Sequence, residues 1–310
     1  MKVLVTGVSG QLGYDVVNNL ISRGYEAIGS DIHKMYNGVA DGSPVTTAQY
    51  IEMDITEKNS VNNVLTELKP DVIIHCAAWT AVDAAEKEEN RVRVDAINHI
   101  GTRNIANAAK SIDAKMVYIS TDYVFDGQGT RPWEPDDKSF APLNVYGQSK
   151  LDGEFAVSKL LEKFFIVRIA WVFGKNGKNF IKTMLRIGKN REFVTVVDDQ
   201  IGTPTYTFDL ARLLVDMVET EKYGFYHVTN SEIDGQYISW ADFTQWIYDV
   251  AGYSTKVNKV TTMEYGASVA ARPFNSRLDK KKLVEAGFMP LPTWKDAVKR
   301  YMRELDLEDL

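Results

Sequence analysis

The sequence predicts an α/β fold, a doubly wound parallel sheet with a smaller C-terminal lobe. In the first half of the chain, short β-branched runs alternate with longer amphipathic segments, as strands alternate with crossover helices in a parallel sheet. Several of these runs are apolar on both faces, which fits a sheet covered by helices on each side. From Phe173 onward the pattern changes to Gly- and Asn-rich loops with isolated helices, which indicates a second lobe.

The elements follow from these patterns in chain order. Strands are expected at Lys2–Thr6, Tyr25–Gly29, Tyr50–Met53, Val72–Cys76, Met116–Ser120, Phe165–Ile169 and Gly224–Val228. Helices are expected at Gln11–Arg23, Glu57–Leu68, Val92–Lys110, Tyr146–Leu161, Asn179–Lys189, Thr207–Glu219, Ser239–Ala251 and Trp294–Glu304. The Gly-, Ser- and Thr-rich stretch Asn37–Ala48 is expected to form a surface loop.

The strand near Phe225 is expected to return to the main sheet, so the two parts of the chain interleave. Residues 1–170, with a returning segment at about 206–230, then form the larger domain. Residues 171–205 and 231–310 form the C-terminal lobe.

Composition and charge exclude several classes of protein. The 310 residues are 45% hydrophobic and 25% charged, as in ordinary globular chains, and a net charge of −6 gives no reason to expect nucleic acid or an anionic membrane as partner. Cys76 is the single cysteine, so no intrachain disulfide or cysteine-rich metal site is expected. The N-terminus shows no signal-peptide pattern and no apolar run reaches the ~20 residues of a membrane span, so a cytoplasmic location is predicted.

A glycine-rich turn follows the first expected strand. In TGVSGQLG (residues 6–13), three glycines have the spacing G-x-x-G-x-x-G and open an amphipathic helix. Glycine allows the backbone to turn tightly and approach a pyrophosphate, and the helix N-terminus offers free N–H groups to the anion. The turn therefore predicts a dinucleotide-binding domain, with the lobe as substrate domain. The residues expected to contact the cofactor here are Gly7, Gly10, Gln11, Leu12 and Gly13.

Acidic residues at later strand ends extend the expected cofactor site. Asp31 ends the second strand, where a carboxylate accepts hydrogen bonds from the adenosine ribose and favours a cofactor without a 2′-phosphate. His33 and Lys34 follow at once and are able to pair with such a phosphate, so NADH and NADPH both stay open. Asp54 and Ile55 lie where adenine contacts are expected, although Asp54 is equally suited to cap the following helix.

A phenol, an ammonium and a hydroxyl are expected to meet at one edge of the sheet. YGQSK (146–150) sets Tyr146 and Lys150 four residues apart on one helix face, where the charge is expected to lower the tyrosine pKa from about 10. STDYVFDG (120–127) leaves a strand at the carboxyl edge, where open parallel sheets bind ligands. Thr121, Tyr146 and Lys150 together predict a carbonyl-reduction site, whereas Ser120 is expected to bond turn amides.

Seven segments resemble, in their order, the dTDP-4-dehydrorhamnose reductases, a Rossmann-like family of extended short-chain dehydrogenase/reductases. The resemblance covers essentially the whole chain, and STDYVFDG followed by Y-G-x-x-K and R-x-x-W-V-F-G is specific in combination. It implies hydride transfer from NADPH or NADH to the C4 ketone of dTDP-4-dehydro-L-rhamnose, with Tyr146 as proton donor. It also implies that Lys150 holds the nicotinamide ribose and that Thr121 orients the carbonyl. The segments are TGVSGQLG, HCAAWTAVDAAE, AIN, STDYVFDG, NVYGQSK, RIAWVFG and RPFNSRLD.

The segment HCAAWTAVDAAE and the following helix add expected contacts. The resemblance implies that Ala77, Ala78 and Thr80 line the cofactor and the sugar, with Val82 on the substrate side. A plain strand-end turn is the alternative. Asn98 is expected in the cofactor site, through a water or backbone contact, with helix capping or exposure as the alternative.

The C-terminal segments are implied to bind the rest of the substrate. Trp171 is expected to stack on the sugar, although a core tryptophan fits nearly as well. Arg272, with Asn275 and Ser276, is expected to hold the nucleotide diphosphate, for which a guanidinium is well suited. A surface salt bridge is the alternative for Arg272.

Some family members bind a divalent metal through carboxylates at a dimer interface. At the early position that would match, this chain has Asp15 in place of the longer glutamate. We therefore predict no metal, and either a monomer or a homodimer. The loop Asn37–Ala48 also is longer than expected for the family.

Two alternative functions are retained from the same fold. A nucleotide-sugar 4-epimerase would recycle its cofactor without net consumption, whereas a 4,6-dehydratase is disfavoured because dehydratases resemble T-D-E where this chain has Thr121-Asp122-Tyr123. The regulatory subunit of methionine adenosyltransferase also resembles these reductases and would be a non-catalytic cofactor-binding protein. The complete set of Thr121, Tyr146 and Lys150 favours an enzyme.

Overall fold

The computed structural model describes residues 1–36, 47–266 and 268–305, so most of the expected loop Asn37–Ala48 lies outside the described residues. Its centre is a seven-stranded sheet with the order β11-β6-β5-β4-β1-β2-β3, in which every neighbouring pair is parallel. The strands are β1 (Lys2–Thr6), β2 (Glu26–Asp31), β3 (Gln49–Glu52), β4 (Val72–His75), β5 (Lys115–Thr121), β6 (Phe164–Ile169) and β11 (Gly224–His227).

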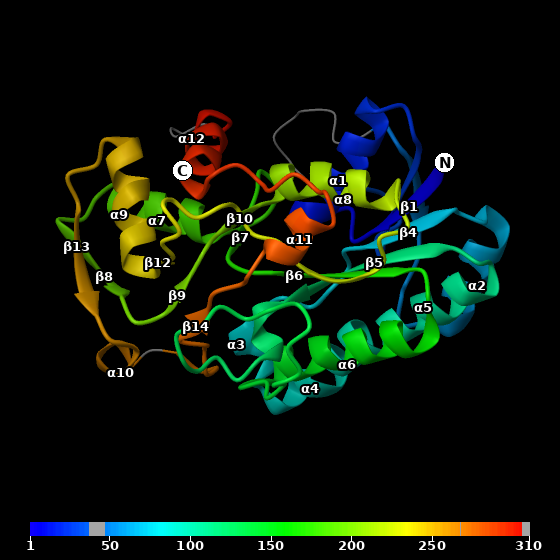
Figure 1. The fold of residues 1–310 in the computed structure, drawn as a ribbon, viewed down its shortest axis with the longest axis horizontal. Coiled ribbons are helices and arrows are strands. Elements are labelled where there is room, and N and C mark those ends of the chain that lie inside the picture. The colour runs from blue at the N-terminus through cyan, green and yellow to red at the C-terminus, as the bar shows by residue number, and fades with distance from the viewer. Residues whose placement is uncertain (37–46, 267, 306–310) are drawn as a thin grey trace.

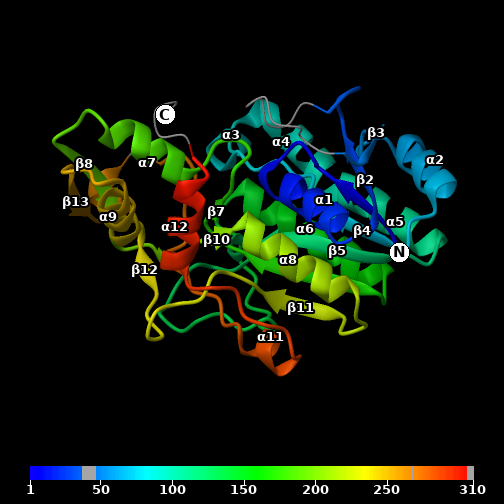
Figure 2. The same cartoon turned by 90° about the horizontal axis from the view of Figure 1, so that it is seen from above.

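Helices cover both faces of this sheet, as Figures 1 and 2 show. α1 (Gln11–Ser22) and α8 (Thr207–Val218) lie on one face, and α2 (Lys58–Leu68), α5 (Thr102–Ser111) and α6 (Val145–Leu160) lie on the other. The three central residues of β1 are apolar because both faces of the strand are covered: Val3 and Val5 join the core under α1, and Leu4 joins the core under α2 and α5. The predicted doubly wound α/β fold is confirmed.

The helix expected at Val92–Lys110 starts earlier and is interrupted. α4 (Glu88–Asp95) runs into a π-helical turn, η1 (Ala96–Gly101), and then into α5. π-helical turns are rare and insert a residue into the α-helical repeat. The side chains after the turn therefore point in other directions than they would in an unbroken α-helix. The short α3 (Val82–Ala85) precedes α4 and lies beside α6.

The C-terminal lobe has a separate, aromatic-rich core that includes Phe173, Phe243 and Trp294. Strand β11 and helix α8 return to the main sheet, as the sequence predicts. Leu283 and Phe288 also pack in the core under α1 and α8, so the segment around α11 contacts the larger domain. The remaining elements are β7 (Val172–Phe173), α7 (Phe180–Gly188), β8 (Phe193–Val197), β9 (Ile201–Gly202), β10 (Thr205–Tyr206), β12 (Ile238–Ser239), α9 (Trp240–Ala251), β13 (Lys256–Val260), α10 (Thr262–Tyr265), β14 (Asn275–Ser276), α11 (Lys281–Glu285), α12 (Trp294–Arg303) and the 3₁₀ turn η2 (Asp122–Val124).

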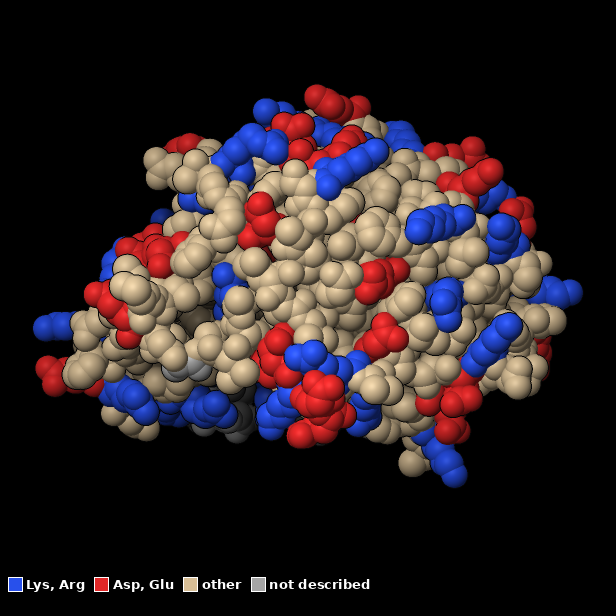
Figure 3. Space-filling model, turned by 90° about the horizontal axis from the view of Figure 1, so that it is seen from below, with Lys and Arg blue, Asp and Glu red and all other residues tan. Residues whose placement is uncertain are grey.

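The surface carries charges of both signs. On the face shown in Figure 3, basic and acidic side chains interleave around a largely uncharged centre. Across the described residues, no helix combines the length and the apolar character needed to cross a bilayer.

Candidate active site and cofactor cleft

Two adjoining cavities, of about 410 Å³ and about 430 Å³, open at the carboxyl ends of the central strands. They share Gly7, Gly10, Cys76 and Ala78 in their walls, so one elongated ligand can extend through both. We call them the adenine-side cavity and the reaction cavity. Most residues predicted to bind cofactor or substrate line them: Gly7, Gly10, Gln11, Leu12, Gly13, Asp31, Asp54, Ile55, Ala77, Ala78, Thr80, Val82, Thr121, Tyr146, Lys150 and Trp171.

The glycine-rich turn has the shape that a pyrophosphate requires. Gly7 has φ +68°, and a Cβ atom there would lie 2.5 Å from the backbone nitrogen of Ala77. A Cβ on Gly13 would lie 2.2 Å from the Gly7 carbonyl oxygen, so only glycine allows α1 to pack this close to the turn. Gly10 precedes α1 without a side-chain cap, which leaves the first N–H groups of the helix available to an anion. These features fit a dinucleotide.

Asp31 and Asp54 both organise turns in the adenine-side cavity. The Asp31 carboxylate accepts hydrogen bonds from the backbone N–H groups of Ser9 (3.0 Å) and Ile32 (2.8 Å), which ties the end of β2 to the glycine turn. Asp54 Oδ1 accepts from the backbone N–H (2.9 Å) and the hydroxyl (2.7 Å) of Thr56. Asp54 therefore shapes the turn and is not the N-cap of α2, which is Glu57.

Thr121 links the end of β5 to the tyrosine. Its hydroxyl donates to Asp122 Oδ1 (3.0 Å), accepts from the backbone N–H of Tyr123 (3.3 Å) and hydrogen-bonds the Tyr146 phenol. A Cβ on Gly147 would lie 2.4 Å from the Tyr123 carbonyl oxygen, so the glycine after Tyr146 allows α6 to pack against this turn. The Ser120 hydroxyl finds no hydrogen-bond partner among the described residues, so the expectation that it bonds turn amides is wrong.

The electrostatics of the pair Tyr146 and Lys150 differ from the sequence expectation. Burial raises the pKa of Tyr146 above its usual 10, and the hydrogen bond with Thr121 only partly opposes this effect. Burial also lowers the pKa of Lys150 to about 7, against the field of Glu154. The expectation that Lys150 lowers the Tyr146 pKa is therefore wrong for the protein without ligands, because desolvation has the largest effect on the pKa of both groups.

Comparison with known proteins places the chain in a family. Residues 1–307 match the model of the family described as "RmlD substrate binding domain". The chain belongs to this family.

Relatives of this RmlD-family chain cover nearly its full length. Spore coat polysaccharide biosynthesis protein SpsK of Bacillus subtilis strain 168 is 38% identical over 98% of this chain and 97% of its own length. A dTDP-4-dehydrorhamnose reductase of Aggregatibacter actinomycetemcomitans is 37% identical over 96% and 97%. A crystal structure of dTDP-4-dehydrorhamnose reductase from Bacillus anthracis strain Ames in complex with NADP is 38% identical, with a TM-score of 0.85 over 98% of this chain and 100% of that chain.

Three of the predicted site residues of this RmlD-family chain, Asn98, Arg272 and Asn275, do not line either cavity. Asn98 is fully buried in η1, where its side chain accepts from the Trp79 N–H (2.8 Å) and donates to the Ser149 hydroxyl (2.9 Å). Asn275 is also buried, and its amide donates to the carbonyl oxygens of Gln128 and Arg131. Both amides hold loops around the site, and their contacts with cofactor and substrate stay sequence-based predictions.

The predicted diphosphate ligand Arg272 pairs with a carboxylate in this structure. Its guanidinium donates to both oxygens of Asp83, at 3.1 Å and 2.7 Å, and the Ala270 N–H donates to the same carboxylate (3.0 Å). Asp83 is the second residue of α3, directly after the cavity residue Val82, so the pair fixes the segment before β14 beside the cleft. Ser276 lies buried and hydrogen-bonds Asp122, which lines the reaction cavity.

Trp171 is a wall of the reaction cavity of the RmlD-family chain. Its indole stacks on Trp240, with ring centroids 3.8 Å apart, and its backbone has φ +51°, which is unusual for a bulky residue. The Thr205 N–H bonds the Trp171 carbonyl oxygen (3.2 Å) and helps to hold this conformation. Strained backbone of this kind is found at ligand sites. Trp171 therefore both lines the cavity and packs against core residues.

Sequence reasoning missed several residues of the cavities. Asp122 lines the reaction cavity, and burial raises the pKa of this carboxyl to about 6 in spite of hydrogen bonds from Ser276 and Thr121. Its place directly after Thr121 was an available signal. Trp240 and Arg93, in contrast, come from distant segments with no local pattern that points to a ligand.

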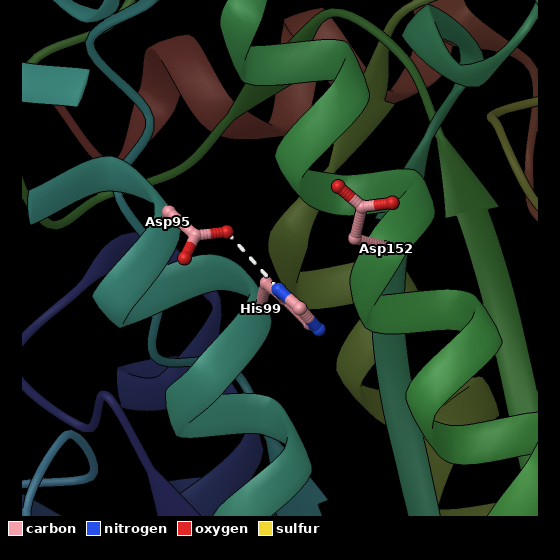
Figure 4. Close-up of side chains that lie close together, drawn as sticks. All are labelled: Asp95, His99 and Asp152. Atoms are coloured by element: carbon pink, nitrogen blue, oxygen red, sulfur yellow. Dashed lines mark hydrogen bonds and ion pairs between the residues drawn. The ribbon is translucent and has the colours of Figure 1, made fainter. Parts of the chain in front are cut away.

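Possible metal ligands lie outside the cleft. Among the described residues, Asp95, His99 and Asp152 form one group whose ligand atoms are within 4.8 Å of one another (Figure 4). They come from α4, η1 and α6, line neither cavity, and include a hydrogen bond of 3.0 Å between Asp95 and His99. Asp15, the residue at the early carboxylate position, is buried and accepts a hydrogen bond of 2.5 Å from Thr207.

Proposed function

We propose that this RmlD-family chain reduces the C4 ketone of dTDP-4-dehydro-L-rhamnose to dTDP-L-rhamnose with NADPH or NADH. The single observation that supports this most is the meeting of Thr121, Tyr146 and Lys150 in one cavity that continues into the glycine-rich turn. The names of the full-length relatives, at 35–38% identity, support the same reaction.

The cofactor would lie across both cavities. Its pyrophosphate fits the turn formed by Gly7, Gly10 and Gly13, and its adenosine fits the adenine-side cavity with Asp31 and Asp54. When bound, the nicotinamide supplies the hydride. Asp31 favours a ribose without a 2′-phosphate, whereas the Bacillus anthracis relative was solved with NADP, so we propose that both cofactors are accepted.

Tyr146 would give its phenolic proton to the ketone oxygen. Because burial raises its pKa, the phenol stays protonated near neutral pH until the oxygen becomes basic enough to take the proton. Lys150 would hold the nicotinamide ribose, and its charge would stabilise the phenolate that Tyr146 becomes. Thr121 would orient the carbonyl and the phenol through its hydroxyl. Thr121 and Lys150 are buried, and Tyr146 is partly exposed at the wall of the reaction cavity.

The sugar nucleotide would enter from the side of the lobe. Thr80, Val82 and Trp171 line the reaction cavity where the sugar would lie. We keep Arg272 as the diphosphate ligand. In this role the diphosphate would replace Asp83 as the hydrogen-bond acceptor of the guanidinium. We also keep the division into a cofactor domain and a substrate lobe, a cytoplasmic location, and a monomer or homodimer as sequence-based predictions.

The test is to mix the protein with dTDP-4-dehydro-L-rhamnose and each reduced cofactor, follow cofactor absorbance and identify the sugar product. Reduction predicts one cofactor oxidised for each dTDP-L-rhamnose formed. An altered sugar without net cofactor consumption would instead identify an epimerase. Tight cofactor binding without any turnover would identify a binding protein.

A further inference from the structure

Lys150 lies in a place with very few partners for a charged group. The residue is 3% exposed, and within the described residues its ammonium makes no hydrogen bond or ion pair. The contact that it does make is with an aromatic face, because Nζ lies 4.2 Å from the centroid of the Tyr118 ring. A cation this close to a ring, away from water, is in the range where cation–π attraction is strong.

The Tyr118 ring is held firmly in this position. Tyr118 lies on β5, three residues before Thr121, and is fully buried. Its hydroxyl donates to the backbone carbonyl oxygen of Lys150 (3.2 Å), and a Cβ on Gly153 would lie 2.2 Å from that hydroxyl. The His75 imidazole is nearly parallel to the ring, with centroids 6.0 Å apart. The ring is therefore clamped against α6 on the turn that carries Lys150.

The other titratable groups around Lys150 do not replace this contact. Glu154, one turn along α6, is fully buried with Arg168, which donates to both of its carboxylate oxygens at 2.8 Å and 2.7 Å. Burial holds the pKa of His75 at about 3 and raises that of Cys76 to about 12, so both are neutral near pH 7. Tyr146 is a neutral phenol. Glu154 thus acts on Lys150 only through its field, already reduced by Arg168.

We propose that Tyr118 is a positioning residue whose aromatic face keeps the Lys150 ammonium charged and directed into the reaction cavity. The catalytic meaning of this role rests on the proposed function, because Lys150 needs its charge to hold the ribose and to stabilise the phenolate. The role belongs to the ring and not to the hydroxyl, since the hydroxyl is already bonded to the backbone. Tyr118 touches neither cavity and acts through Lys150.

The experiment measures the charge of Lys150 directly in the protein without ligands. Lysine labelled with ¹³C at Cε is incorporated, the Lys150 signal is assigned by its loss in Lys150→Gln, and its pKa is read from a pH titration by NMR. Tyr118→Phe keeps the ring, and Tyr118→Leu removes it. Phenylalanines with increasing ring fluorination at position 118 keep the shape of the ring while weakening its attraction for cations, so the proposal is testable even if Tyr118→Leu folds poorly. Tyr248→Leu removes an equally buried tyrosine from the lobe core as the control.

The proposal predicts a graded result. Tyr118→Phe titrates as the unmodified protein, whereas Tyr118→Leu and the fully fluorinated ring lower the Lys150 pKa by about one unit. The pH dependence of kcat/KM moves by the same amount, and the KM for the cofactor rises. An unchanged Lys150 pKa with the fully fluorinated ring would overturn the proposal, as would an equal decrease in Tyr248→Leu. Since the NMR titration needs no substrate, a failure of the proposed reduction would leave its result intact.

Discussion

Asp15→Asn should make the protein more stable, and the gain should grow with pH. Asp15 is buried beneath the glycine-rich turn at the contact between α1 and α8, with Thr207 as its hydrogen-bond donor. Burial raises the pKa of the carboxyl from 3.8 to about 7, with the field of Glu304 acting in the same direction. The folded state therefore keeps a proton that the unfolded chain loses near pH 4, and stability from this group falls as the pH rises from about 4 to about 7.

The size of the effect follows from the shift. At 1.36 kcal/mol per pKa unit, a shift of about three units corresponds to an upper value of about 4 kcal/mol. Asparagine can still accept from Thr207 and carries no charge, but its N–H groups need partners, so part of this gain is lost. Between pH 5 and pH 8 about two of these pKa units develop, or about 3 kcal/mol, so at roughly 2 °C per kcal/mol the Tm difference should grow by about 5 °C.

The assay is thermal unfolding of the unmodified protein and Asp15→Asn at several pH values between 5 and 8. The quantity of interest is the difference in Tm, because titrations shared by the two proteins cancel. Asp234→Asn, which neutralises an exposed carboxylate in a loop, is the control and should show a difference that does not grow with pH. A Tm difference for Asp15→Asn that stays constant from pH 5 to pH 8 would refute the reasoning.

Four further variants test the site. Tyr146→Phe should lower kcat by roughly 10²–10⁴ with cofactor affinity nearly unchanged, and turnover like that of the unmodified protein would remove tyrosine from the acid role. Lys150→Ala should weaken both turnover and cofactor binding in titrations, and intact binding would disprove the ribose contact. Gly13→Ala should abolish measurable cofactor binding, because its Cβ would lie 2.2 Å from the Gly7 carbonyl oxygen. Gly10→Ala, with 3.2 Å to the same atom, should cost much less, so equal losses in the two alanine variants would contradict the packing argument.

The main sheet was predictable because its strands are buried on both faces and therefore appear as continuous apolar runs. β1 matches the expected bounds, Lys2–Thr6, and the glycine-rich turn after it indicated where a dinucleotide would bind. The short strands of the lobe were not predictable. β9, for example, has two residues, Ile201 and Gly202, and pairs with segments far along the chain. Nothing in so short a run distinguishes a strand from a loop.

The site shows the same division between local and distant causes. Spacing placed Tyr146 and Lys150 on one face of α6, but spacing carries no information about desolvation, which reverses the expected direction of the tyrosine pKa shift. Asn98 appeared suited to the cofactor site, yet the π-helical turn directs its amide to Trp79 and Ser149. The stacking of Trp240 on Trp171 joins two segments that no local pattern connects.

The central claim is that one cavity brings the ketone, the phenol and the nicotinamide together for direct hydride transfer. The most direct measurement uses reduced cofactor deuterated at C4 of the nicotinamide, in each of its two epimeric forms, with dTDP-4-dehydro-L-rhamnose in ordinary water. With one epimer, we expect dTDP-L-rhamnose that carries one deuterium at C4 of the sugar for each cofactor oxidised. A product without deuterium at C4 from either epimer, or an altered sugar formed while the cofactor stays reduced, would contradict the account.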